Sequence, residues 1–93
     1  MTMTPAAFET ALAEARAGME RLAAHYPENA ALASACRQLA HVADWTRDGA
    51  RPTAEQVGRL SFGLIAAREI ETLDLPLAEQ LYALSAYLEA RRG

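Results

Sequence analysis

The residues of this chain best suited to moving a proton are its two histidines, His25 and His41. Each follows an arginine by four residues, Arg21 and Arg37, in the patterns R-L-A-A-H and R-Q-L-A-H. Patterns as short as these have low specificity, so we interpret both pairs as ordinary residues of a helix surface. The sequence offers no convergent set of an acid, a base and a nucleophile from which a catalytic centre could be assembled. The sequence therefore predicts no catalytic residue and no enzymatic activity.

The single cysteine, Cys36, excludes an internal disulfide and a cysteine-based zinc site. Neither histidine belongs to an H-E-x-x-H or E-x-x-H pair, so we expect no metal site and no cofactor. Leu32 and Leu39 lie about one helical turn to either side of Cys36, and we expect its thiol to be a small buried apolar group. A lone free cysteine also fits a reducing cytoplasm.

Two glycines, Gly58 and Gly63, lie five residues apart in a segment that we expect to be helical. No strand precedes them, so they do not form a phosphate-binding loop. Glycine inside a helix costs about 0.5–1 kcal/mol relative to alanine. The two positions therefore indicate that another backbone of the fold, or a partner, approaches this helix closely.

The remaining candidates are residues that could bind another protein. Glu69, Glu71 and Asp74 form an acidic cluster at the end of the third expected helix. Burying an unpaired carboxylate costs several kcal/mol, so Glu69 must face outward or have a partner, such as an arginine, inside the fold. Trp45 lies about 100° from the apolar stripe of the second helix, and exposed tryptophans are frequent interface anchors. We predict Glu69, Glu71, Asp74 and Trp45 as binding residues.

The apolar spacing predicts an all-α fold, a compact antiparallel four-helix domain. Alanine, the best helix former, is abundant, whereas valine and isoleucine together occur four times. Thr4, Asn29 and Thr53 can cap the first three helices, and Pro5 suits a first helical position. The expected helices, all in a single domain over 1–93, cover about 5–26, 30–47, 54–73 and 76–91.

The third expected helix is apolar all round. At 100° per residue, Val57 and Leu64 fall on one side, and Phe62 and Ile70 fall nearly opposite. A helix of this kind is usually the buried centre of a domain. Tyr26 instead ends the single stripe of the first helix, and we expect it in the core.

Charge and hydropathy exclude several classes of partner. Nine arginines, no lysine and twelve acids give a net charge of −3. Such thin positive charge argues against a nucleic-acid binder, whose affinity comes mainly from neutralised phosphates. The N-terminal residues lack signal-peptide features, and no uncharged apolar stretch approaches the roughly eighteen residues of a membrane span. We therefore expect a cytoplasmic protein that binds neither nucleic acid nor a membrane.

The segment LSFGLIAAREIETLD, residues 60–74, resembles a stretch of the immunity proteins that protect bacteria against a type VI-secreted toxin that hydrolyses NAD(P). Its most unusual part is the run G-x-I-A-x-[KR]-E, from Gly63 to Glu69. A second stretch, from Tyr26-Pro27 to Leu39, matches at the same spacing. The likeness covers about residues 10–85.

This resemblance implies a cytoplasmic inhibitor that binds the catalytic domain of a cognate toxin one to one and blocks entry of the dinucleotide. The toxin would be an NAD(P) glycohydrolase or a related nucleotide-targeting toxin. The acidic cluster near Asp74 would then meet a basic substrate pocket and mimic the dinucleotide's phosphates. A second interpretation stays open. The apolar third helix could instead form the homodimer of a self-associating helical adaptor or regulator.

Overall fold

The first two helices begin where the sequence predicts. Helix α1 (Pro5–His25) is capped by Thr4, whose Oγ1 accepts a hydrogen bond from the Ala7 N–H at 3.1 Å. Helix α2 (Ala30–Trp45) is capped by Asn29, whose Oδ1 accepts from the first free N–H groups of the helix. The computed structural model describes residues 3–92, and this range contains helices and no strand. The all-α fold class is therefore confirmed.

The chain leaves α2 through the 3-10 turn η1 (Arg47–Gly49). Asp48 and Gly49 both have positive φ, 58° and 77°. Glycine adopts this left-handed conformation at little cost, and aspartate tolerates it better than most residues do. The chain therefore turns away from the helix direction at Asp48-Gly49, and α2 itself ends at Trp45, two residues before the expected boundary at 47.

The helix expected over 54–73 is not continuous, and this prediction is wrong. It divides into α3 (Ala54–Gly58), α4 (Phe62–Ile65) and the π-helical turn η2 (Ala66–Ile70). Gln38 of α2 occupies the break after α3. Its Oε1 accepts from the Ser61 N–H at 2.7 Å, and its Nε2 donates to Ser61 Oγ at 3.0 Å. A side chain from another helix thus satisfies the backbone group that a continuous helix would have bonded internally.

This break also overturns the expectation that the third helix is the buried centre of the fold. Residues before and after the break do not lie on one continuous helix, so a single helical wheel does not describe which of them are buried. Val57 and Phe62 are both buried, whereas Leu64 is 53% exposed. The α4–η2 segment packs one face against α2 and α5 and leaves the other face in solvent.

The two glycines of this segment have different roles. A Cβ atom at Gly63 would lie 3.2 Å from Ser85 Oγ, so a larger residue would require the Ser85 side chain of α5 to shift. The close approach predicted at this glycine is present, and the neighbouring atoms belong to a side chain. At Gly58 a Cβ atom would meet nothing within 4 Å, because this residue ends α3 instead of lying inside a helix.

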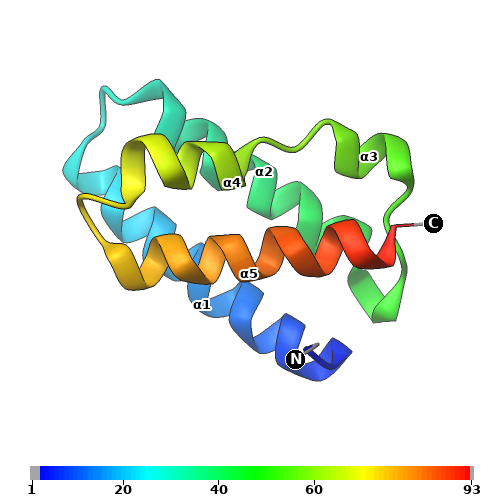
Figure 1. Cartoon of the computed structure of the whole chain (residues 1–93). Helices are drawn as coiled ribbons and strands as arrows, with labels where there is room; N and C mark the ends of the chain where they lie inside the picture. Colours follow the sequence, from blue (N-terminus) through cyan, green and yellow to red (C-terminus); the bar gives the residue numbers. More distant parts are fainter. Residues whose placement is uncertain (1–2, 93) are drawn as a thin grey trace.

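Helix α5 (Leu75–Arg91) runs along the molecule and contacts α1, α3, α4 and η2. Its leucines recur every three or four residues and form one stripe, which is buried against the other helices: Leu77, Leu81, Leu84 and Leu88. Figure 1 shows two turns at one end of the bundle: the one after α1 (cyan) and the one after η2 (yellow). We call this the turn end and define it as Tyr26–Asn29 and Glu71–Leu75. The η1 end, opposite, comprises η1, α3, the first turn of α1 and the last turn of α5.

Candidate functional site

The four predicted binding residues do not form one site. Glu69, Glu71 and Asp74 lie in and beside the turn end, but Trp45 is the last residue of α2 and lies toward the η1 end. The 16 residues of α2 separate them by about 22 Å at 1.5 Å per residue. Trp45 is half-buried against the core, and its ring stacks on that of His41 with centroids 5.8 Å apart. It therefore lies too far away to join the acidic cluster.

Glu69 connects the two turns. It is half-buried, and its Oε1 accepts a hydrogen bond from Asn29 Nδ2 at 3.1 Å. The internal partner is thus an amide, whereas the sequence suggested an arginine. Asn29 meanwhile caps α2 through Oδ1, so a single side chain holds both the start of α2 and the carboxylate of η2.

Asp74 caps α5. Its Oδ1 accepts a hydrogen bond from the Leu77 N–H at 3.1 Å, and Pro76 follows in the first turn of the helix. A carboxylate at this position also interacts favourably with the positive end of the helix dipole. Asp74 is half-buried, so its local role is to start a helix.

Glu71 is the most accessible of the three acids. It is exposed, and its Oε2 accepts a hydrogen bond from the Tyr82 hydroxyl of α5. That hydrogen bond to a carboxylate favours the neutral phenol and raises the pKa of Tyr82 above its ordinary value of 10.0. Glu71 caps no helix, so it can present its charge to a partner without a change in the fold.

Exposed apolar side chains at the turn end were missed by the sequence interpretation. Tyr26, Leu73 and Leu75 are 44%, 43% and 50% exposed. Tyr26, expected in the core, leaves the stripe because α1 ends at His25 and Tyr26 has φ −130° and ψ 63°. Leu75 falls outside the stripe of α5 that begins at Leu77, and this offset is the signal that could have found it.

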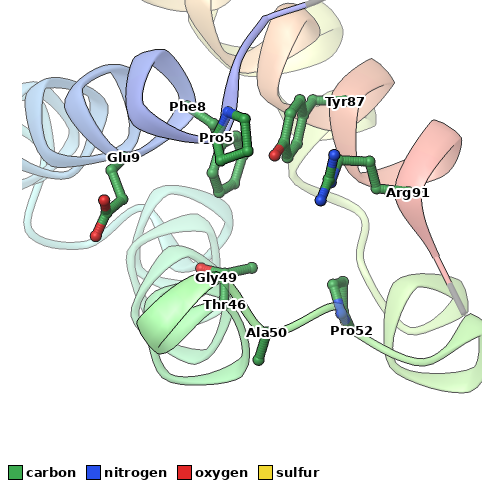
Figure 2. Close-up of a pocket in the computed structure, with 9 residues that line it drawn as sticks. All are labelled: Pro5, Phe8, Glu9, Thr46, Gly49, Ala50, Pro52, Tyr87 and Arg91. Atoms are coloured by element: carbon green, nitrogen blue, oxygen red, sulfur yellow. The ribbon is translucent and has the colours of Figure 1, made fainter.

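A small hollow lies at the η1 end, where the start of α1 meets the end of α5 and the loop after η1 (Figure 2). The Phe8 and Tyr87 rings stack there with centroids 4.2 Å apart, and the Arg91 guanidinium lies 5.3 Å from the centre of the Tyr87 ring. The hollow measures about 40 Å³, enough for a few water molecules and too small for a nucleotide.

The residues with potential for chemistry are not assembled into a centre. His25 and His41 are both exposed. Cys36 is half-buried, less than expected, and burial raises the pKa of its thiol, with the charge of Glu20 adding to the shift and that of Arg37 opposing it. A raised pKa leaves less of the nucleophilic thiolate.

Two further findings concern residues 3–92. Among them no group of three or more histidine, cysteine, aspartate or glutamate side chains is arranged to hold a metal ion. No helix in the same range combines the length and the apolar character needed to cross a membrane.

Comparison with known proteins gives one match. The family model described as Tsi6 matches residues 4–90, which include every helix of the fold from α1 almost to the end of α5. The comparisons with curated proteins and with solved structures give no match.

Proposed function

Because the chain belongs to the Tsi6 family of type VI secretion immunity proteins, we propose that it binds the catalytic domain of a cognate toxin one to one and blocks its active site. The family match over residues 4–90 carries this proposal. The resemblance of segment 60–74 supports the finer statement that the toxin hydrolyses NAD(P). The protein would then act in the cytoplasm, where its cell's dinucleotide lies, and would catalyse nothing itself.

The size of the chain suits this role. Its accessible surface is 5637 Å², and a standard interface takes about 800 Å² from each partner, about a seventh of that surface. A toxin that consumes a cell's dinucleotide is harmful as a few free molecules, so the complex needs nanomolar affinity, about −12 kcal/mol. No nucleic acid or membrane enters this proposal.

Co-expression with a type VI toxin, sought first in the gene next to that of this protein, tests the proposal. We expect the protein to restore growth, and the purified protein to abolish NAD(P) hydrolysis by the toxin's catalytic domain at a one-to-one ratio. Failure to bind and protect would overturn the function. Protection against a toxin with no effect on NAD(P) would overturn only the chemistry assigned to the toxin. Turnover of NAD(P) by the purified protein alone would overturn its assignment as a non-enzyme.

One observation favours the alternative of a self-associating adaptor. Leu64 is 53% exposed on the outer face of α4, where a second copy could pack. Analytical ultracentrifugation separates the two functions. A tight symmetric dimer without affinity for the toxin would favour the adaptor, and a monomer that forms a one-to-one complex would exclude it.

A further inference from the structure

Three large apolar side chains at the turn end are exposed to solvent. Tyr26, Leu73 and Leu75 are three of the four large apolar residues that are exposed within residues 3–92. They come from two segments far apart in the sequence, which the bond between Asn29 and Glu69 joins across 40 residues. A shallow depression lies over His25–Asn29 beside them. Apolar groups clustered within a polar rim are typical of protein interfaces.

The rim of this surface carries the net charge of the whole chain. The turn end, residues 26–29 and 71–75, contains three acids and no arginine, an excess of three negative charges. The rest of the chain has nine acids and nine arginines, so it is neutral. The ion pairs found among residues 3–92, Arg47–Asp44, Arg59–Glu55 and Arg92–Glu89, all lie toward the η1 end. The negative potential is therefore concentrated at the turn end.

The turn end is also held in place by its own hydrogen bonds. Asn29 ties it to Glu69, and Asp74 fixes the start of α5. Before the second turn, the Glu71 N–H donates to the Ala66 carbonyl at 2.9 Å, which closes the π-helical turn η2. π-helical turns are rare in proteins as a whole, and a large share of those that occur lie at functional sites. A surface fixed before binding loses little conformational entropy when a partner docks.

These observations select the partner. In a symmetric homodimer the same patch meets itself, so the excess of negative charge at the turn end would face a second copy of that excess. A basic partner is attracted to this negative charge, whereas a second copy of the chain is repelled by it. A cleft that binds the phosphates of a dinucleotide needs positive groups to do so. We propose that the turn end docks on the basic rim of the toxin's dinucleotide cleft, with Leu73, Leu75 and Tyr26 at the centre of the contact. This inference rests on the immunity function proposed above.

Matched variants test the location of the contact. Leu75→Ser removes an apolar group at the turn end, and Leu64→Ser removes one of nearly equal exposure on α4 (50% against 53%). Glu28→Arg reverses an exposed acid at the turn end, and Glu9→Arg reverses one in α1 toward the η1 end. None of these four residues caps a helix or belongs to the buried core. Circular dichroism melting should therefore show native folding for all four variants.

Binding of each variant to the catalytic domain of the cognate toxin is then measured by surface plasmon resonance. We expect Leu75→Ser to weaken binding at least tenfold, since burying a leucine contributes about 1.5–3 kcal/mol. Glu28→Arg should slow association, and added salt should slow association of the wild type. Leu64→Ser and Glu9→Arg should bind within about twofold of the wild type.

The outcomes distinguish this inference from the function beneath it. A wild type that does not bind the toxin overturns the function and the inference together. A wild type that binds tightly while Leu75→Ser and Glu28→Arg bind equally well overturns the docking surface and leaves the function standing. Loss of affinity in Leu64→Ser instead would place the contact on α4. An association rate indifferent to salt would overturn the basic partner rim.

Discussion

The two ends of the bundle use the same residue types in opposite ways. At the η1 end, acids pair with arginines three or four residues away, and the rings of Phe8 and Tyr87 stack against each other, both buried. At the turn end, the acids accept hydrogen bonds from neutral donors, and apolar side chains lie in solvent.

The difference shows how one end can be well ordered and still highly charged. An arginine neutralises the carboxylate that it contacts, so the η1 end has little net field. An amide, a phenol or a backbone N–H satisfies the carboxylate's hydrogen bonding and leaves its charge intact. Glu69, Glu71 and Asp74 are all of this second kind. The three carboxylates thus stabilise the local structure of this region through hydrogen bonds and keep their negative charge.

The largest expected effect comes from removing the apolar support of the turn end. Ile70 is fully buried at the end of η2, and Ile70→Ala should lower the free energy of unfolding by about 2–5 kcal/mol. It should also weaken toxin binding, because the turn that follows loses its anchor. Urea denaturation and toxin binding measure the two effects. Val57→Ala, on the buried face of α3, is the control: it should reduce stability and leave the toxin affinity of the folded protein unchanged. Equal losses of toxin affinity in Ile70→Ala and Val57→Ala would contradict the difference proposed between the two ends of the bundle.

Removing the amide that joins the two turns should have the next largest effect. Asn29→Ala deletes the cap of α2 and the partner of Glu69, and we expect a loss of about 2 kcal/mol. Thr53→Ala deletes only the capping box of α3 at the η1 end and should cost about 1 kcal/mol. Thermal and urea unfolding give both values. The connecting role of Asn29 is disproved if its replacement costs no more than that of Thr53.

An ion pair at the η1 end should matter little. Arg59 and Glu55 have side chains 70% and 76% exposed, and such pairs contribute less than about 1 kcal/mol. Arg59→Ala should therefore change the free energy of unfolding by no more than about 0.5 kcal/mol, with toxin affinity unaffected. Urea denaturation at low and high salt measures this. A loss above about 1 kcal/mol would show that local pairing stabilises this end more than the comparison allows.

The smallest expected effect is a change in titration. The bond to Glu71 raises the pKa of Tyr82, so Glu71→Gln should move that pKa down toward 10.0. Because the folded-state pKa is the higher one, the associated stability is present below pH 10 and is lost as the pH rises through the folded-state pKa. Absorbance titration of tyrosinate, with Tyr82→Phe as reference, isolates this group from Tyr26 and Tyr87. An unchanged titration in Glu71→Gln would show that the hydrogen bond is absent in solution.

Local features of this fold could be predicted from the sequence because their causes are local. The caps at Thr4, Asn29 and Thr53 each bond to a backbone N–H two or three residues further on, so the pattern and its cause lie in the same short segment. The stripe of α5 follows from the period of a single helix. The class of fold followed from the same regularities.

The features that could not be predicted have distant causes. The break before α4 depends on Gln38, 23 residues from Ser61. The partner of Glu69 lies 40 residues away, so spacing within one helix could not identify it. For the candidate site, Glu69, Glu71 and Asp74 fall within six residues of one another, so the sequence alone places them in one region of the molecule. The position of Trp45 at the other end of α2 could not be predicted in this way, because periodicity places a residue around a helix and does not relate the ends of different helices.

The π-helical turn η2 gives this scaffold a way to change what it recognises. It holds one residue more than an α-helical turn would, and each residue of an α-helix rotates the chain by about 100°. Deletion of one residue between Ala66 and Ile70 would return the segment to α-helical phase and rotate Glu71 and Leu73 to new directions. A one-residue insertion or deletion is thus a short evolutionary route by which such a protein could follow a toxin whose surface has diverged.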